Sequence, residues 1–351
     1  VLSFLGIVMR YVALLFVMLL AWVSAPLHAD TGQQRAEAAG HGLVGSPAPR
    51  MVLKTIDGQT IDLASLYGKK AVYLKFWATW CVPCREQMPH FEHTFEQAGP
   101  DLAVIAIDVG FDDTVADVRK YRQAMGLHMP IVFDDGTLDQ AFQLRVTPQH
   151  VVIGRDGRIL YVGHMADAKL DAALLAARTT SGAPVKSVQA PKEEPPVDVG
   201  DHLPAFTART LDGQTFHAQD AGKKLPTALV FLSPWCESYL ATSRPGVASS
   251  CRAVRKQVAA LSGDDHARWL GIASGLWASK DDLGNYQRKY HPGIPLTLDE
   301  SGALFRRFRV MHVPTLLIVD ADGRIVRRVE GTDANLAAEL KSLAKRQAPA
   351  R

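Results

Sequence analysis

The sequence predicts an α/β protein of two tandem domains, each with a mixed central sheet flanked by helices. Three observations support this prediction. The chain has 351 residues, which suits two domains of ordinary size. Each half alternates β-forming apolar runs with amphipathic runs of helical period. The second half repeats motifs of the first half in the same order.

The internal repeat relates motifs that lie 155 to 166 residues apart. Its members are "TIDGQTIDL" (55–63) with "TLDGQTFHA" (210–218), Trp-Cys at 80–81 with Trp-Cys at 235–236, and "VTPQHVVIGRDGRIL" (146–160) with "VPTLLIVDADGRIV" (313–326). Because the offset grows along the chain, the second copy has gained about 11 residues after its Trp-Cys. The repeat is too long for a solenoid, whose period is about 20 to 50 residues, and indicates a duplicated domain.

The first copy is expected to form six elements. In order they are a buried strand at 71–78, a helix over 85–99, a buried strand at 102–110, an amphipathic helix at 115–126, a hairpin at 149–163 and a helix at 168–177. The strands are continuous apolar runs rich in β-formers, and the run at 227–233 has the same character in the second copy. Asp156-Gly157 suits the turn of the hairpin. Strands that alternate with helices and end in a hairpin give a mixed sheet.

The helix over 85–99 is predicted from its apolar spacing. Met88, Phe91 and Phe95 lie on one helical face, and Gly99 suits the end of the helix. Pro89 interrupts the pattern and is expected to kink the helix.

Five segments are expected along the chain. They are a secretory signal or N-terminal anchor at 1–29, a first domain at 43–178, a Pro-rich linker at 179–197, a divergent second domain at 198–345 and a tail at 346–351. The apolar run at 11–24 follows Arg10, and Ala29 is a small residue suited to cleavage. Such a run is shorter than the roughly 20 residues of a membrane span. Export places the protein in an oxidising compartment.

The composition excludes two broad classes of protein. Hydrophobic residues make up 47% of the chain and charged residues 21%, so the chain is globular and not disordered. A net charge of +3, without a run of Lys or Arg, argues against a nucleic-acid partner.

The pair Cys81 and Cys84 predicts redox chemistry. Cys81 follows a predicted strand, and Cys84 falls in the first turn of a predicted helix, where Pro83 is also suited. Free N–H groups at the start of a helix stabilise a thiolate, so Cys81 is the expected attacking sulfur. Cys84 can then resolve a mixed disulfide on Cys81. A structural disulfide and half of a zinc site are the alternatives, although zinc usually needs a second pair of ligands.

With these motifs in place, the chain resembles the TlpA/ResA-like thiol–disulfide oxidoreductases of the thioredoxin and redoxin superfamily. The resemblance rests on "FWATWCVPCREQMP" (76–89), "VTP" (146–148) and "GRDGRI" (154–159). It covers about 43–178 well and 198–345 more weakly. It implies a thioredoxin-like fold for both domains.

The resemblance also implies roles for single residues. Cys81 is the exposed nucleophile and Cys84 the buried resolving cysteine. Pro148 corresponds to a cis-proline that faces the dithiol, and together with Thr147 it holds the backbone of the partner chain. Trp80 shields the site. Members of the family act in the bacterial periplasm, commonly as disulfide reductases and often in cytochrome c maturation. The implied partners are protein disulfides and a membrane electron donor of the thiol-redox type, with no cofactor and no metal.

Two positions depart from the family pattern. Lys75 stands on the strand beneath the dithiol, where thioredoxins carry an acidic residue, so it is a candidate for tuning the pKa of the thiols if it is charged. Burial would instead make it neutral and a candidate proton acceptor. Alternatively, Lys75 extends its charged end to solvent. Gln87 stands where the ResA-like branch has a glutamate, and the adjacent Glu86 is expected to be a surface charge.

The second copy keeps Trp235-Cys236 but has Tyr239 in place of the second cysteine. Its other cysteine is Cys251, at a distance of about 22 Å if one helix joined the two. The segment "SRPG" (243–246) breaks helices, so the chain can fold back.

Three alternatives remain open for the second domain. They are a Cys236–Cys251 pair, a single reactive Cys236, and a relic domain kept for binding, with Pro314 as the counterpart of Pro148. A peroxidase motif is missing before Cys236, and a copper site with His312 is a remote alternative. We therefore expect an exported disulfide reductase whose second domain positions substrate or relays electrons. The alternative function is a non-enzymatic binding or copper-handling protein.

Overall fold

The computed structural model describes residues 31–181, 185–186, 188–189, 194–219, 225–263 and 266–345. The expected signal or anchor at 1–29, the expected tail at 346–351 and the middle of the expected linker lie outside these residues. Within the described ranges, every helix is too short or too polar to cross a membrane.

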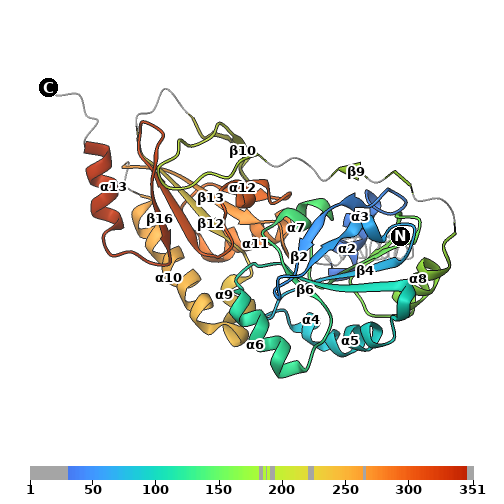
Figure 1. The fold of residues 1–351 in the computed structure, drawn as a ribbon. Coiled ribbons are helices and arrows are strands. Elements are labelled where there is room, and N and C mark those ends of the chain that lie inside the picture. The colour runs from blue at the N-terminus through green and yellow to red at the C-terminus, as the bar shows by residue number, and fades with distance from the viewer. Residues whose placement is uncertain are drawn as a thin grey trace, which may run out of the picture. The chain divides into compact units, whose positions relative to one another are not determined.

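The first domain is built on a mixed five-stranded sheet in the order β6-β5-β4-β7-β8 (Figure 1). Its strands are β4 (Ala71–Trp77), β5 (Leu102–Asp108), β6 (Ile131–Phe133), β7 (Gln149–Ile153) and β8 (Ile159–Gly163). The central strand β4 runs parallel to β5 and antiparallel to β7. Its helices are α2 (Gly32–His41), α3 (Leu63–Leu66), α4 (Val82–Glu86), α5 (Met88–Glu96), α6 (Val115–Met125), α7 (Thr137–Ala141) and α8 (Ala168–Thr179).

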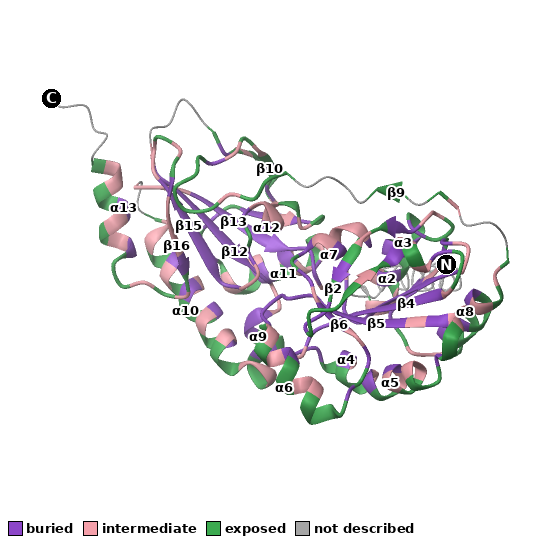
Figure 2. Ribbon diagram, viewed as in Figure 1, coloured by how far each residue is buried: buried purple, intermediate pink, exposed green. Residues whose placement is uncertain are grey.

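The second domain repeats this sheet in the order β14-β13-β12-β15-β16. Its strands are β12 (Thr227–Leu232), β13 (Arg268–Ser274), β14 (Leu296–Asp299), β15 (Thr315–Val319) and β16 (Ile325–Glu330). Its helices are α9 (Cys236–Ser243), α10 (Pro245–Leu261), α11 (Lys280–Tyr290), α12 (Ala303–Arg307) and α13 (Leu336–Lys345). The two sheets confirm the predicted fold class. All residues of β4 and β12 are buried (Figure 2), which explains their unbroken apolar sequences.

Short strands lie outside the two large sheets. They are β1 (Pro49–Arg50) with β9 (Val188–Gln189), β2 (Val52–Lys54) with β3 (Thr60–Asp62), and β10 (Thr207–Arg209) with β11 (Thr215–His217). The strand β9 comes from the expected linker and pairs in parallel with β1, so this part of the linker lies against the first domain.

The helix expected over 85–99 is two helices instead of one kinked helix. The helix α4 ends at Glu86, and α5 begins at Met88, with Gln87 as the cap of both. Pro89 lies in the first turn of α5, because its ring would clash with a carbonyl one turn earlier in a continuous helix. The expected stop at Gly99 is also wrong, since α5 ends at Glu96 and Gly99 starts a short 3₁₀ turn.

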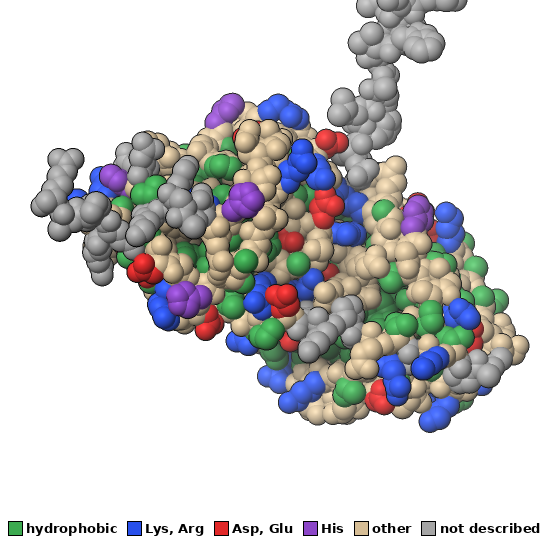
Figure 3. Space-filling model, turned by 90° about the horizontal axis from the view of Figure 1, so that it is seen from above, with side chains coloured by type: hydrophobic (Ala, Val, Ile, Leu, Met, Phe, Trp, Pro, Cys, Tyr) green, Lys and Arg blue, Asp and Glu red, His purple; other side chains and the backbone are tan. Residues whose placement is uncertain are grey.

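Charged side chains are interspersed over the surface. On the face shown in Figure 3, acidic and basic groups lie side by side, in keeping with the net charge of +3.

All four cysteines are in disulfides. Cys81 pairs with Cys84, and Cys236 pairs with Cys251 at a Cα–Cα distance of 6.4 Å. The second pairing corresponds to the first of the three alternatives for this domain. It forms because α9 ends at Ser243 and α10 starts at Pro245, so the chain turns back at Arg244 and the length of one straight helix no longer applies.

We expect the second disulfide to contribute more stability than the first. The cysteines of the second pair are 15 residues apart and those of the first pair are 3 apart. Closing the longer loop costs the unfolded chain more entropy, so Cys236→Ser/Cys251→Ser should lower the free energy of unfolding by about 3 kcal/mol. The matched variant Cys81→Ser/Cys84→Ser should lower it by about half as much. Urea unfolding of both variants measures this difference, and equal losses would contradict the prediction.

Candidate functional site

The dithiol lies in the turn between β4 and α4. Cys81 is the N-cap of α4, and its Sγ accepts a hydrogen bond of 3.2 Å from the backbone N–H of Cys84. Pro83 occupies the first turn, as predicted. In the reduced state the same N–H group can donate to a thiolate on Cys81, and the thiolate is the attacking species in disulfide exchange.

The loop before β7 lies at the same end of the sheet as the dithiol. Phe76 near the end of β4 is opposite Gln149 at the start of β7, so Pro148 is at the edge from which the chain continues to Cys81. The Thr147–Pro148 peptide bond is cis, and the Val313–Pro314 bond is cis at the equivalent place in the second domain. Cys251 and Pro314 line one small cavity, which also contains Glu237.

Lys75 lies in β4 beneath the dithiol and is fully buried. The alternative in which it extends to solvent is therefore wrong. Its Nζ is 3.4 Å from the carbonyl oxygen of Cys84 and 5.3 Å from the centre of the Phe91 ring. Burial lowers the pKa of Lys75 to about 7, so near neutral pH a neutral amine is available to accept a proton.

A buried polar cluster beside Lys75 was not predicted. His150 is opposite Lys75 in the β4–β7 ladder, and its Nδ1 is 2.8 Å from the Tyr73 hydroxyl. The Nε2 of His150 is 2.9 Å from Oε1 of Gln87, and that oxygen also accepts from the N–H of Ala166. Burial, together with the charge of Lys75, holds the pKa of His150 well below its usual range. A histidine inside an apolar strand was the available signal, and Gln87 proves to be its neutral partner.

Trp80 is covered by two aromatic residues of the second domain. Its ring stacks on Trp235 with centroids 5.3 Å apart, and the ring of Tyr239 is nearly perpendicular to it with centroids 6.2 Å apart. The Tyr239 hydroxyl accepts a hydrogen bond of 3.0 Å from the backbone N–H of Val82. The residue that replaces the missing cysteine therefore lies at the start of α4.

The expectation of an exposed nucleophile is wrong for this structure. Cys81 and Cys84 have no exposed surface, and Trp80 is 2% exposed. Thr147 is also fully buried, and its Oγ1 accepts a hydrogen bond of 3.0 Å from Nε1 of Trp277. The sequence could not reveal this cover, since the covering residues lie about 130 to 160 positions further along the chain.

The structure leaves no free thiol for the copper alternative. Cys236 and Cys251 are disulfide-bonded, and Nδ1 of His312 faces Asp112 Oδ1 at 3.5 Å. The hydrogen bond with Asp112 raises the pKa of His312. Among the described residues, Glu92, Glu96 and His128 are close enough to share a metal ion, a common arrangement of surface acidic groups without one.

Comparison with known proteins places both domains in one family. The model of the AhpC/TSA family matches residues 44–162 and 199–328. Over 120 residues the chain is 30% identical to thiol-disulfide oxidoreductase ResA of Bacillus subtilis. The matched region covers 34% of this chain and 65% of ResA. Over 130 residues it is 32% identical to the thioredoxin-like protein YneN of the same organism, covering 36% of this chain and 76% of YneN.

Solved structures give matches of similar extent. A thiol:disulfide interchange protein of the thioredoxin family from Chlorobium tepidum is 28% identical, covering 38% of this chain and 97% of that chain, with a TM-score of 0.35.

Lys75 should make stability depend on pH. The unfolded chain binds a proton at Lys75 below about pH 10.5, whereas the folded protein binds it only below about pH 7. Between these values the unfolded state holds more protons, so stability rises with pH, by about 3 kcal/mol from pH 7 to pH 9.5. Lys75→Met should remove this rise, and urea unfolding at the two pH values measures it.

The exposed Lys69 provides the control for this experiment. Lys69→Met should leave the pH profile as in the wild type. Parallel profiles for Lys75→Met and the wild type would contradict the assignment.

Proposed function

Because this chain belongs to the AhpC/TSA family, we propose that it is a thiol–disulfide oxidoreductase whose first domain carries the redox-active pair. One observation carries the proposal. Cys81 caps α4 and is bonded to Cys84 in the first turn of that helix, at the sheet edge that also holds a cis-proline loop. Two relatives support it, one named a thiol-disulfide oxidoreductase and the other a thioredoxin-like protein.

The reaction proceeds in two exchange steps. The Cys81 thiolate attacks one sulfur of a protein disulfide, and a bond between Cys81 and that sulfur replaces the substrate disulfide while the other substrate sulfur leaves as a thiolate. The Cys84 thiol then loses its proton and attacks the sulfur of Cys81. The Cys81–Cys84 disulfide forms, and the second substrate thiolate leaves. Two electrons have passed from the dithiol to the substrate.

Lys75 is the group that we assign to the proton of Cys84. It is buried under the residue that must lose the proton, and its pKa of about 7 allows it to be neutral before the step and charged after it. The resemblance to reductases supports electron flow from the dithiol to the substrate, and we propose that a thiol-type electron donor restores the dithiol. The predicted signal or anchor at 1–29 supports a periplasmic location.

Single cysteine variants test the order of attack. Cys84→Ser should form a stable mixed disulfide with insulin, because the resolving thiol is missing, while Cys81→Ser should form none. Non-reducing gels and mass spectrometry detect the adduct. A matched variant, Cys236→Ser/Cys251→Ser in the Cys84→Ser background, should still form it. An adduct on Cys81→Ser that is lost with Cys236 would place the chemistry in the second domain.

The reduction potential of the Cys81/Cys84 pair tests the direction. A reductase should have a value below about −150 mV, in the range of thioredoxin-type reductants and not of strong oxidants. Equilibration with glutathione buffers and mass analysis of the first pair give this potential. A value above that limit would make the protein an oxidase.

A further inference from the structure

We propose that the second domain is a resident occupant of the substrate-binding face of the first domain, so that a substrate reaches Cys81 only after this occupant moves away. The proposal rests on the proposed function, because that function defines the face. It assigns a role to the second domain that its own cysteines do not provide.

The contact on the cis-proline loop has the form expected of a bound polypeptide. The backbone N–H of Trp277 donates to the carbonyl of Arg145 at 3.0 Å, and its indole Nε1 donates to Thr147 Oγ1 at 3.0 Å. The ring of His164 lies edge-on to the indole, with centroids 5.4 Å apart. Trp277 thus occupies two polar groups of the loop that was expected to hold a partner backbone.

Trp277 adopts a conformation that its residue type disfavours. Its φ is +59°, in the left-handed region, where a bulky side chain is a rare outlier. Such strain persists where surrounding contacts over-determine it, often at ligand clamps. Here those contacts are the two hydrogen bonds to the loop of the other domain.

The same contact occurs a second time with the domains exchanged. Asp112 follows β5 as Trp277 follows β13, and its φ is +54°. Its backbone N–H donates to the carbonyl of Met311 at 2.8 Å, and its Oδ1 accepts from the N–H of Val313. Each domain therefore places the equivalent loop on the cis-proline loop of the other. This reciprocity indicates a specific docking of two related faces.

The indoles of the two Trp-Cys motifs complete the pairing. Nε1 of Trp80 donates to the Phe111 carbonyl at 2.7 Å, and Nε1 of Trp235 donates to the Leu276 carbonyl at 2.9 Å. Each indole fixes the loop of its own domain and stacks on the other indole across the contact.

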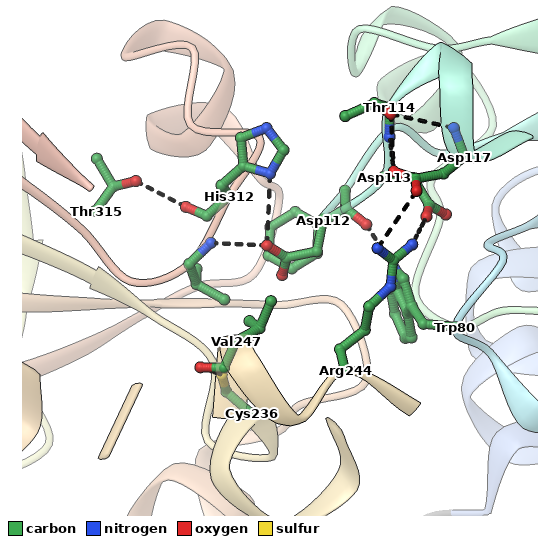
Figure 4. A network of polar contacts seen from close by, with 12 residues as sticks. Trp80, Asp112, Asp113, Thr114, Asp117, Cys236, Arg244, Val247, His312 and Thr315 are labelled. Carbon is green, nitrogen blue, oxygen red and sulfur yellow. Dashed lines mark hydrogen bonds and ion pairs between the residues drawn. The ribbon is translucent and has the colours of Figure 1, made fainter. Parts of the chain in front are cut away.

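Arg244 closes the contact on one side (Figure 4). Its guanidinium pairs with Asp113 and donates to Thr79 Oγ1 at 2.8 Å, two residues before Cys81. Arg244 lies in the break between α9 and α10, inside the segment that the Cys236–Cys251 disulfide closes. The inserted residues thus include the arginine that holds the second domain on the face of the first.

The reactivity of Cys81 in the full chain tests the proposal. After reduction, Cys81 should be alkylated by iodoacetamide at least about tenfold faster in Arg244→Ala and in Trp277→Phe than in the wild type. Each substitution removes a contact that forms only while the second domain lies on the face of the first. Peptide mass mapping gives the rate for Cys81 alone. The rate of insulin reduction should rise in the same variants.

Arg252→Ala is the matched control. Arg252 lies on α10 and pairs with Glu237 of its own domain at 3.7 Å, with its side chain 54% exposed. In Arg252→Ala, Cys81 should be alkylated at the same rate as in the wild type. Tyr239→Phe removes only the hydroxyl that faces Val82 and provides a third, milder variant.

The outcomes separate the two proposals. Unchanged or slower alkylation in the folded variants, with circular dichroism as in the control, overturns the occupant role even if insulin is reduced. Faster alkylation without any insulin reduction supports the cover and overturns the proposed reductase function. If Arg244→Ala does not fold, Trp277→Phe and Tyr239→Phe decide the question alone.

Discussion

A buried carboxylate of the first domain depends on an arginine of the second. The side chain of Asp113 has no exposed surface, and burial raises its pKa to about 6 against the effect of two hydrogen bonds from Thr79 and the charge of Arg244. A pair of this kind gains little net stability, because the carboxylate loses its hydration and the arginine loses part of its own. Breaking it inside the protein costs much more, since one buried charge is left alone. The pair therefore specifies how the two faces meet.

A second buried acid lies behind the first. Asp108 ends β5 and is fully buried, and its Oδ1 accepts from the N–H of Gly110 at 2.9 Å. Burial, and then the charge of Asp113, raises the pKa of Asp108 well above its usual range. Two further aspartates, Asp112 and Asp113, lie in the loop that follows β5. Asp113 pairs with Arg244, whereas Oδ1 of Asp112 faces Nδ1 of His312 at 3.5 Å.

The second copy has Tyr239 where the first has its second cysteine, and this tyrosine contacts the first copy. Tyr239 supplies a hydroxyl to the N–H of Val82, at the helix start where the first copy holds its dithiol. The partner of Cys236 is Cys251, and not a cysteine at position 239. Their disulfide closes the turn in which Arg244 lies, next to the first domain. These two changes are connected, since both serve the face that lies on the first domain. Lys75 and His150 are both buried beneath the dithiol. Burial lowers the pKa of each, which favours the neutral form of both side chains.

The sequence alone determined the duplicated α/β architecture and the strand–turn–helix setting of Cys81 and Cys84, because these depend on local spacing and on periodicity along the chain. The cis-proline at Pro148 was expected from the family resemblance, and the structure has it. The sequence predicted a kink at Pro89, whereas the helix is interrupted two residues earlier, at Gln87. A proline disfavours a continuous helix but does not determine at which residue the helix ends. The sequence also left the partner of Cys236 open. Only the tertiary structure decided that Lys75 is buried, that His150 and Gln87 pair beneath the site, and that Tyr239 and Trp277 cover it. These contacts join residues far apart in the chain, and their choice depends on how two folded surfaces fit, for which a linear pattern carries no signal.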